Sequence, residues 1–230
     1  MRRDEDDAAA NVADMAPHLW VQANHDLRQP LQALFFMTRS LARIADAKVQ
    51  ETAAYMEAAL QGLQGKLELL TELSRLETGS KVPRFHTCGL AAVCQSLLPG
   101  MTTLAAGQGV RLRTRFVEAQ VVSDEQLLSL MVRSLTLNAL KLANQPDVLM
   151  ASRRRDTRVN VEFYFKGAAI GDAQRKGAFV QLSPKDHPSS ELALGLGFIA
   201  HLGQSLDHVL ECKTLPRDGV CLALSLPEAA

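Results

Sequence analysis

The chain has 230 residues, of which 47% are hydrophobic and 22% charged, a composition typical of a soluble protein with one large or two small packed domains. Its 25 basic and 25 acidic side chains cancel, and no lysine and arginine cluster is interleaved with aromatic residues, so a nucleic-acid-binding protein is not indicated. No apolar run approaches the roughly 20 residues of a membrane helix, and the acidic start lacks the apolar core of a signal peptide, so we expect a cytoplasmic chain with no membrane segment.

Two familiar kinds of site are excluded by motif. The cysteines form no CxxC pair and have no histidine at metal-ligand spacing, which argues against zinc and against a disulfide framework. We expect them to be small core residues: Cys88, Cys94, Cys212 and Cys221. The sequence also contains no Walker A motif, so a P-loop nucleotide site is excluded.

The first part of the chain predicts a helical hairpin. Residues 1–16 are polar and aperiodic, and we expect a lead-in without regular structure. From Trp20 to Ala45, and after a turn near Asp46, apolar residues recur at alternating three- and four-residue spacing, which predicts two antiparallel helices within residues 17–80. One hairpin cannot bury both of its faces, so we expect two copies to form a four-helix bundle, which makes the protein a homodimer.

The second part, residues 84–230, mixes helical and strand periodicity. We predict three helices, at 90–104, at 124–143 with Asp124 as N-cap, and at 192–202. We predict five strands, at 110–116, 147–151, 159–165, 206–213 and 220–226, with a long loop at 167–190. The expected fold class is therefore α+β, a helical hairpin followed by a two-layer α/β sandwich.

A short run in the first helix carries the clearest chemistry. It reads Asn24, His25, Asp26, Leu27, Arg28, Gln29, Pro30, Leu31, and it resembles the phosphoacceptor box of two-component histidine kinases. The resemblance implies that His25 carries a phosphoryl group on a ring nitrogen. One ring nitrogen must be unprotonated to attack phosphorus, and the carboxylate of Asp26 is suited to hold the proton on the other. The alternatives are a surface histidine and a first-turn acidic residue.

The residues that follow His25 have two interpretations each. Arg28 either neutralises phosphoryl charge or is a solvated helix residue. Gln29 lies four residues after His25, where the family often has a threonine or asparagine that positions water for dephosphorylation of a partner; otherwise it is a surface glutamine. Pro30 removes one backbone hydrogen bond and bends the helix, so its expected role is shape.

The order of elements in residues 84–230 is similar to that of the Bergerat-type ATP-binding domain of histidine kinases. The segment from Ser134 to Lys141 looks like the family's N box, in which two asparagines four residues apart face ATP and magnesium. Asn138 matches the second asparagine and is a weak Mg²⁺ candidate, whereas Ser134 stands at the first position and supplies a poorer ligand. The alternative is that Asn138 and Lys141 are polar residues of an amphipathic helix.

The next box departs from the family pattern, which is Asp, variable, Gly, variable, Gly after a strand. Gly167 and Ile170 fix the alignment, which puts Phe165 at the Asp that receives the adenine amino group and Ala169 at the second glycine. Phenylalanine accepts no hydrogen bond, and an unpaired donor costs about 1 to 3 kcal/mol before steric effects, so we expect weakened ATP binding.

The last box, Gly195, Leu196, Gly197, is retained, and the resemblance implies a following helix whose N-terminus faces phosphates. A GxG pair is also explained by close packing, so this signal is weak alone. The resemblance spans residues 17–227. It implies a phosphotransfer protein that exchanges phosphoryl between His25 and a receiver-domain aspartate, with phosphate supplied by a partner such as an upstream histidine kinase. Two alternatives stay open: an active autokinase that uses ATP and magnesium, and a non-catalytic pseudokinase adaptor that binds response regulators.

Overall fold

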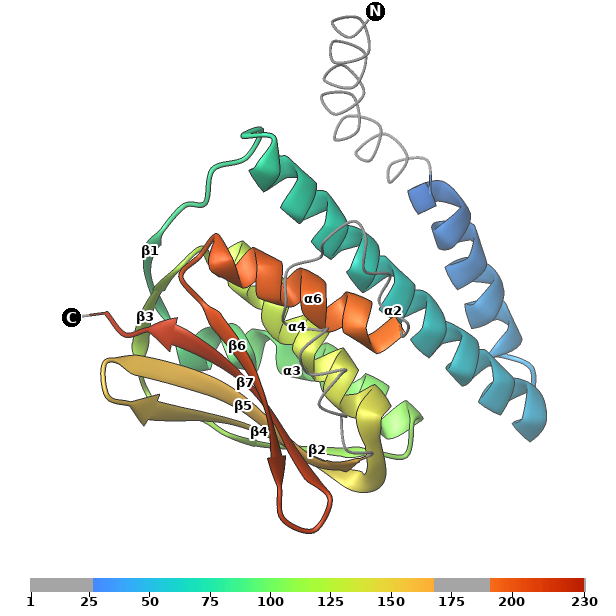
Figure 1. Ribbon diagram of the computed structural model, residues 1–230. Coiled ribbons are helices and arrows are strands. Elements are labelled where there is room, and N and C mark those ends of the chain that lie inside the picture. Colours follow the sequence, from blue (N-terminus) through green and yellow to red (C-terminus); the bar gives the residue numbers. More distant parts are fainter. Residues whose placement is uncertain (1–26, 168–190, 230) are drawn as a thin grey trace, which may run out of the picture. The chain divides into compact units, whose positions relative to one another are not determined.

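The structure is a computed structural model that describes residues 27–167 and 191–229, with the side chains of 191–194 excepted (Figure 1). The expected lead-in and nearly all of the expected loop at 167–190 lie outside these residues. Its internal contacts divide the chain into Met1–Val82, here called unit 1, and Pro83–Ala230, here called unit 2. Each unit is described by itself.

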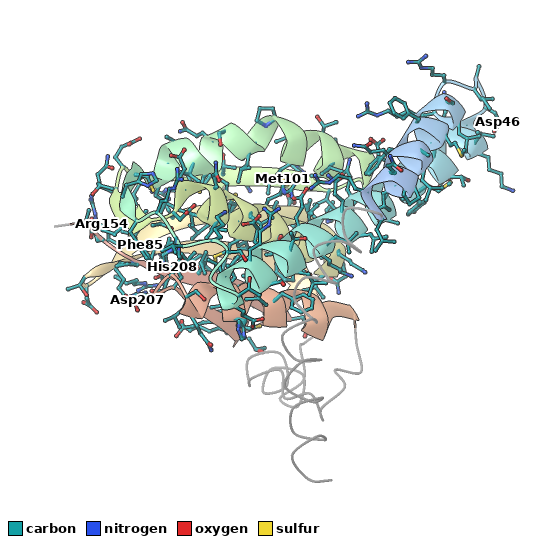
Figure 2. The ribbon with its side chains drawn as sticks, turned by 90° about the horizontal axis from the view of Figure 1, so that it is seen from above. Asp46, Phe85, Met101, Arg154, Asp207 and His208 are labelled. Atoms are coloured by element: carbon teal, nitrogen blue, oxygen red, sulfur yellow. The ribbon has the colours of Figure 1, made fainter. Side chains whose placement is uncertain are left out.

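Unit 1 is an antiparallel helical hairpin, as predicted. Its first helix occupies residues 27–41 and its second is α2, Ala47–Glu77. Asp46 lies at the turn between them (Figure 2), and its Oδ1 accepts the backbone N–H groups of Lys48 and Val49 at 2.9 and 3.1 Å, which starts α2 with a side-chain cap. The two helices also meet through the ion pair of Arg39 with Glu57, at 3.9 Å.

The hairpin leaves much of its apolar surface uncovered. Leu31, Thr38 and Ala53 are buried, and the Thr38 hydroxyl satisfies itself by donating to the Leu34 carbonyl at 2.8 Å. The large apolar side chains that remain exposed in the hairpin are Leu27, Leu34, Phe36, Met37, Ile44, Tyr55, Met56 and Leu63. Four of them, Leu27, Leu34, Met56 and Leu63, belong to the stripes that the sequence pattern predicted for the seam of a bundle.

Unit 2 is a two-layer α/β sandwich, again as predicted. Its main sheet has the strand order β2 (Arg111–Arg115), β4 (Ala143–Arg155), β5 (Arg158–Gly167), β7 (Gly219–Pro227), β6 (Val209–Leu215). Only the β2–β4 pair is parallel. Figure 1 shows the helices on one face of this sheet: α3 (Leu90–Gly107), α4 (Glu125–Leu142) and α6 (Glu191–Gln204).

The core of unit 2 lies between these two layers. In β5, alternate residues are buried toward the helices because successive side chains of a strand point to opposite faces; they are Val159, Val161, Phe163 and Phe165. From the helices, α4 contributes its fully buried side chains Leu127, Leu128, Met131 and Leu135. The other face of the sheet has no helix of unit 2 over it among the described residues.

A second, small sheet was missed by the sequence analysis. β1 (His86–Gly89) pairs antiparallel with β3 (Gln120–Ser123). Each strand has only four residues, and in β1 just one of them is buried, so neither gives the alternation by which strands are recognised.

Three strand boundaries were also wrong, one of them the end of β4, which lies at Arg155 instead of residue 151. β6 begins at Val209 instead of residue 206, because the backbone N–H groups of Leu206 and His208 both donate to the Gly203 carbonyl and Asp207 has a positive φ of 54°, which makes a turn at the end of α6. β4 begins at Ala143 instead of residue 147, with a register shift before Val148. Pro146, which has no N–H for the ladder, lies within that irregular stretch.

The cysteines match their expectation in part. Cys88, Cys94 and Cys221 are buried and Cys212 is half-buried, and all four are free thiols. Burial raises the pKa of Cys94 to about 12, so this thiol is not a nucleophile near neutral pH.

One helix of the described residues, α3, is long and apolar enough to cross a membrane, with 18 residues at a mean hydropathy of 1.3. This statement about α3 rests on its length and composition alone. In unit 2, α3 packs against α4 and β2 as one of the three helices over the sheet.

The carboxylate of Asp124, the predicted N-cap of α4, accepts hydrogen bonds from three backbone N–H groups. Oδ1 of Asp124 accepts the N–H groups of Gln126 and Leu127, both at 3.1 Å, and Oδ2 accepts the N–H of Arg84 at 2.9 Å. We expect Asp124→Ala to lower the free energy of unfolding by about 2 to 3 kcal/mol, because a buried cap is lost and three donors are left unpaired. Urea denaturation measures this. The exposed cap variant Asp46→Ala is the comparison and should lose about 1 kcal/mol or less; equal losses would contradict the prediction.

Candidate functional site

Of the run that resembles a phosphoacceptor box, the structure describes Leu27 and the residues after it. His25 and Asp26 lie outside the described residues. Arg28, Gln29 and Pro30 lie in the first described turn of the first helix, and all three are exposed. Their side chains are therefore accessible to a partner.

Unit 1 has a small cavity beside Arg28. Its volume is about 210 Å³, and the residues that line it come from both helices: Arg28, Leu31, Gln32, Phe35, Gln64, Leu67 and Glu68. The Gln64 amide donates to the Glu68 carboxylate at 3.1 Å, so part of this lining is already hydrogen-bonded. The cavity is smaller than the usual 300 to 1,000 Å³ of a small-molecule site, and it has a mixed polar and apolar lining.

The N-box residues lie along α4. Asn138 is half-buried, and its Nδ2 donates to the Ser134 carbonyl at 2.8 Å, so its amide donor is used within its own helix and Oδ1 remains as an acceptor. Ser134 is 5% exposed, and its hydroxyl has no hydrogen-bond partner among the described residues. Lys141 is exposed in the last turn of α4.

The last glycine box meets the N box, although not in the way expected. A Cβ built on Gly195 would lie 3.4 Å from Asn138 Oδ1, so the structure brings these two predicted residues together where α6 packs on α4. The expectation that Gly195 and Gly197 precede the helix is wrong, because α6 already begins at Glu191. Only the first four N–H groups of a helix lack a partner within it, and both glycines lie beyond these four. Close packing accounts for Gly195.

A buried phenyl ring, that of Phe165, lies near the end of β5. Phe165, at the position of the expected carboxylate, is 5% exposed and points to the helix side of the sheet. A Cβ on Gly167 would lie 2.5 Å from the Leu142 carbonyl oxygen and 3.2 Å from Phe165 Cε2. Gly167 is therefore required by the close approach of β5 to the end of α4, and no nucleotide is needed to explain it.

These observations bear on the predicted ATP site. Phe165 supplies no acceptor for an adenine amino group. The N–H groups of Gly195 and Gly197 lie inside a helix, whereas Asn138 donates one amide N–H to the Ser134 carbonyl and keeps Oδ1 as an acceptor. The described part of the chain also contains no group of three or more His, Cys, Asp or Glu side chains arranged to hold a metal ion.

The sequence analysis missed a charged cluster on the open face of the sheet. The Glu162 side chain is only 5% exposed; it accepts a hydrogen bond from the Tyr164 hydroxyl at 2.6 Å, and Arg153 and Arg155 lie 3.7 and 3.8 Å away. Burial, together with the bond to Glu162, raises the pKa of Tyr164 well above its ordinary value, so the hydroxyl stays a donor. The alternation of polar residues with the buried ones of β5 was the available signal, because it puts Glu162 and Tyr164 on one face.

A buried histidine outside these boxes was also missed. His208 is 3% exposed, and its Nε2 lies 2.8 Å from the Ser123 hydroxyl, which joins the small sheet to the start of β6. Figure 2 labels it beside Asp207. Burial lowers the pKa of His208 to about 4; the charge of Arg158 acts in the same direction, and that of Asp207 acts in the opposite one.

This lowered pKa predicts a loss of stability in acid. The folded state keeps His208 neutral, whereas the unfolded chain takes up a proton near pH 6.5. The neutral imidazole therefore costs no stability above pH 6.5, and the free energy of unfolding decreases as the pH falls toward 4. The loss for 2.5 pKa units is about 3 kcal/mol. We expect wild type to lose this much more than His208→Gln between pH 7 and pH 4 in urea denaturation. Parallel pH profiles for the two proteins would contradict the prediction.

Comparison with known proteins places the fold. No protein-family model and no curated protein matches the sequence. Among solved structures, full-length ShkA in complex with AMPPNP has a TM-score of 0.63 at 18% identity over 93% of this chain. The histidine kinase AdeS of Acinetobacter baumannii has a TM-score of 0.58 at 14% identity, covering 90% of this chain and 98% of that one. A histidine kinase from Burkholderia phymatum has a TM-score of 0.52 at 15% identity over the whole of both chains.

These likenesses establish the fold at low sequence identity. The chain has the fold of a histidine kinase catalytic core, and unit 2 has that of the ATP-binding domain, since the catalytic domain of the histidine kinase ThkA matches 63% of the chain at a TM-score of 0.55. The matched region is 46% of the ShkA chain, so the chain spans less than half of that relative.

Proposed function

We propose that this chain is a two-component phosphotransfer protein, which exchanges a phosphoryl group between His25 and an aspartate of a receiver domain and has lost effective ATP-dependent autophosphorylation. The histidine kinase core fold and the box around His25 support the phosphotransfer. The observation that supports the loss of autophosphorylation is Phe165, a buried phenyl ring at the position where the family has its adenine-binding carboxylate.

The proposed reaction follows from the chemistry of an imidazole and an acyl phosphate. The neutral ring nitrogen of His25 attacks phosphorus; the N–P bond forms as the bond from phosphorus to the receiver's carboxylate oxygen breaks, and the carboxylate leaves as an anion. Asp26 would hold the proton on the other ring nitrogen and stabilise the cation that develops. Arg28, which is exposed, would offset phosphoryl charge. Gln29 would position water in a separate reaction, in which water attacks phosphorus of the receiver's acyl phosphate, the aspartate carboxylate leaves and inorganic phosphate is released.

The dimer belongs to the same proposal. The exposed apolar side chains of unit 1, among them Leu27, Leu34, Met56 and Leu63, form a surface that a single hairpin cannot cover. Packing against a second hairpin would bury it as a four-helix bundle, with the bundle at residues 17–80 and the degenerate ATP-binding domain at 84–230. We further propose that the protein acts in the cytoplasm, where receiver domains would meet it.

The runner-up function is an active autokinase. The favouring observation is the AMPPNP complex of ShkA, a structure with this fold. In that case Asn138, Ser134 and Lys141 would hold nucleotide and Mg²⁺ despite Phe165. A pseudokinase adaptor that docks response regulators without chemistry is the third candidate.

Two measurements on the full chain separate these functions. Calorimetry with ATP and Mg²⁺ should give no heat of binding, whereas binding followed by self-labelling from γ-labelled ATP would establish the autokinase. Incubation with receiver domains that carry labelled acyl phosphate should transfer label to the chain. If no receiver donates label and no upstream kinase does so either, the phosphotransfer function is overturned in favour of the adaptor.

A further inference from the structure

The face of the main sheet opposite the helices is strongly cationic, and we call it the basic face. The strand registers and the alternation of buried residues assign to it eight cationic side chains: Arg111, Arg113, Arg115, Arg153, Arg155, Arg158, Lys166 and Lys213. Three carboxylates share it: Asp147, Glu162 and Glu211. Because the whole chain has a formal net charge of zero, this excess is a local concentration of positive charge.

The centre of the basic face is held in place by a buried carboxylate. Glu162, bonded by Tyr164, lies beneath Arg153 and Arg155, which are themselves more than half exposed. These contacts are ion pairs longer than a hydrogen bond, so Glu162 keeps Arg153 and Arg155 near it by charge and leaves their N–H donors accessible to a further carboxylate.

The margin of the basic face is an open sheet edge. β2 pairs only with β4 in the described part of the chain, so its outer backbone groups have no strand partner there. Arg111 pairs with Asp147 at 3.1 Å, whereas Arg113 and Arg115 are exposed and have no ion pair among the described residues. Arginines two apart on a strand share a face at about 7 Å spacing.

We propose that the β2 edge and the basic face bind an extended acidic protein segment, which adds to the sheet as a further strand beside β2. Main-chain hydrogen bonds to the open edge would supply affinity, and carboxylates at every second residue would meet Arg113 and Arg115. The carboxylates of the bound segment must stand at every second residue, because every second side chain of a strand points to the same face of the sheet. Arginine is suited to this pairing because its planar group bonds a carboxylate with two parallel N–H donors.

A nucleic acid fits this surface less well. Single-stranded nucleic acids are bound by cationic grooves together with aromatic side chains on which bases stack. Among the described residues of the basic face, Tyr164 is the one aromatic side chain; it is half-buried and its hydroxyl is bonded to Glu162. The basic face has positive charge but lacks aromatic side chains on which bases could stack, and this favours a protein segment over a nucleic acid as its ligand.

The test uses the full chain and a fluorescent peptide of about ten residues in which glutamate alternates with threonine, long enough for a typical strand. Fluorescence anisotropy at low salt should show binding that weakens as salt is added. The double variant Arg113→Glu, Arg115→Glu should weaken it by about tenfold or more. The control, Arg43→Glu with Arg84→Glu, makes the same change of charge at exposed arginines outside the face and should stay within about twofold of wild type.

Strand addition is tested separately from charge. A peptide with the same glutamates but N-methylated at alternate amides should lose binding, and hydrogen exchange of the β2 amides should slow when the unmodified peptide is bound. Equal binding of the N-methylated peptide, or competition by oligothymidylate with the same dependence on Arg113 and Arg115, overturns the proposal. Absence of peptide binding overturns it too and leaves these arginines as protection of the edge against aggregation. Phosphotransfer by the double variant should be normal, so this proposal and the proposed function fail independently.

Discussion

Replacing His25 with alanine is expected to abolish phosphoryl transfer to this chain. The imidazole is the attacking nucleophile in the proposed reaction, and alanine has no atom that can form the N–P bond, so labelling from a phosphorylated receiver should fall below about 1% of wild type. His25 stands three residues before Arg28 in the sequence, and Arg28 and Gln29 are exposed, so we expect little change in stability from its replacement.

The matched control for this variant is His86→Ala. His86 is exposed at the start of β1, in unit 2, and lies 3.6 Å from Glu125, so its loss removes a surface histidine without touching the box. Labelling of His86→Ala should equal that of wild type, and the label of wild type should be acid-labile, as a phosphohistidine is. Retention of label by His25→Ala would place the phosphoryl group on another residue and overturn the assignment.

Replacing Phe165 with alanine is expected to cost about 3 to 5 kcal/mol of stability. The ring is 5% exposed at the end of β5 and lies against Gly167, so its removal leaves a cavity between the sheet and α4. The free energy of unfolding is measured by urea denaturation. The exposed Phe85, at 52%, is the control, and Phe85→Ala should lose less than about 1 kcal/mol.

The same variant tests how Phe165 affects nucleotide binding. Removing the ring empties space but supplies no acceptor for the adenine amino group, so Phe165→Ala should bind ATP no better than wild type in calorimetry. A gain of ATP affinity would show that bulk alone blocks the site. A stability loss below about 1 kcal/mol would contradict the view that the ring fills the core.

Periodicity predicted the long elements of this fold because each of them buries one regular face. The hairpin, α4 with its cap at Asp124, and the strands β5 and β7 all repeat their apolar residues over several turns or several alternations. β1 and β3 were missed because four-residue strands give no period, and the start of β6 was misplaced because the turn at Leu206 depends on hydrogen bonds to Gly203, a contact that apolar spacing does not encode.

The predicted site residues divide in the same way. The resemblance assigned Asn138 and Gly195 to one nucleotide site without predicting a contact between them, and the structure brings the two residues together. That Gly195 would precede its helix did not hold, because helix boundaries depend on local hydrogen bonding more than on motif. Glu162 with Arg153 and Arg155 was not predicted, since the cluster exists only when β4 and β5 pair in one register.

The strand order of unit 2 has a consequence for folding during synthesis. β7 lies between β5 and β6, yet it is the last strand of the chain to be made and ends only at Pro227. Until β7 has left the ribosome, β5 has an open edge and β6 has no partner in the sheet, whereas unit 1 is complete after its first 82 residues. The hairpin can therefore fold before unit 2 is complete, and in the proposed dimer it would meet a second hairpin on a neighbouring nascent chain before the rest of the fold has formed.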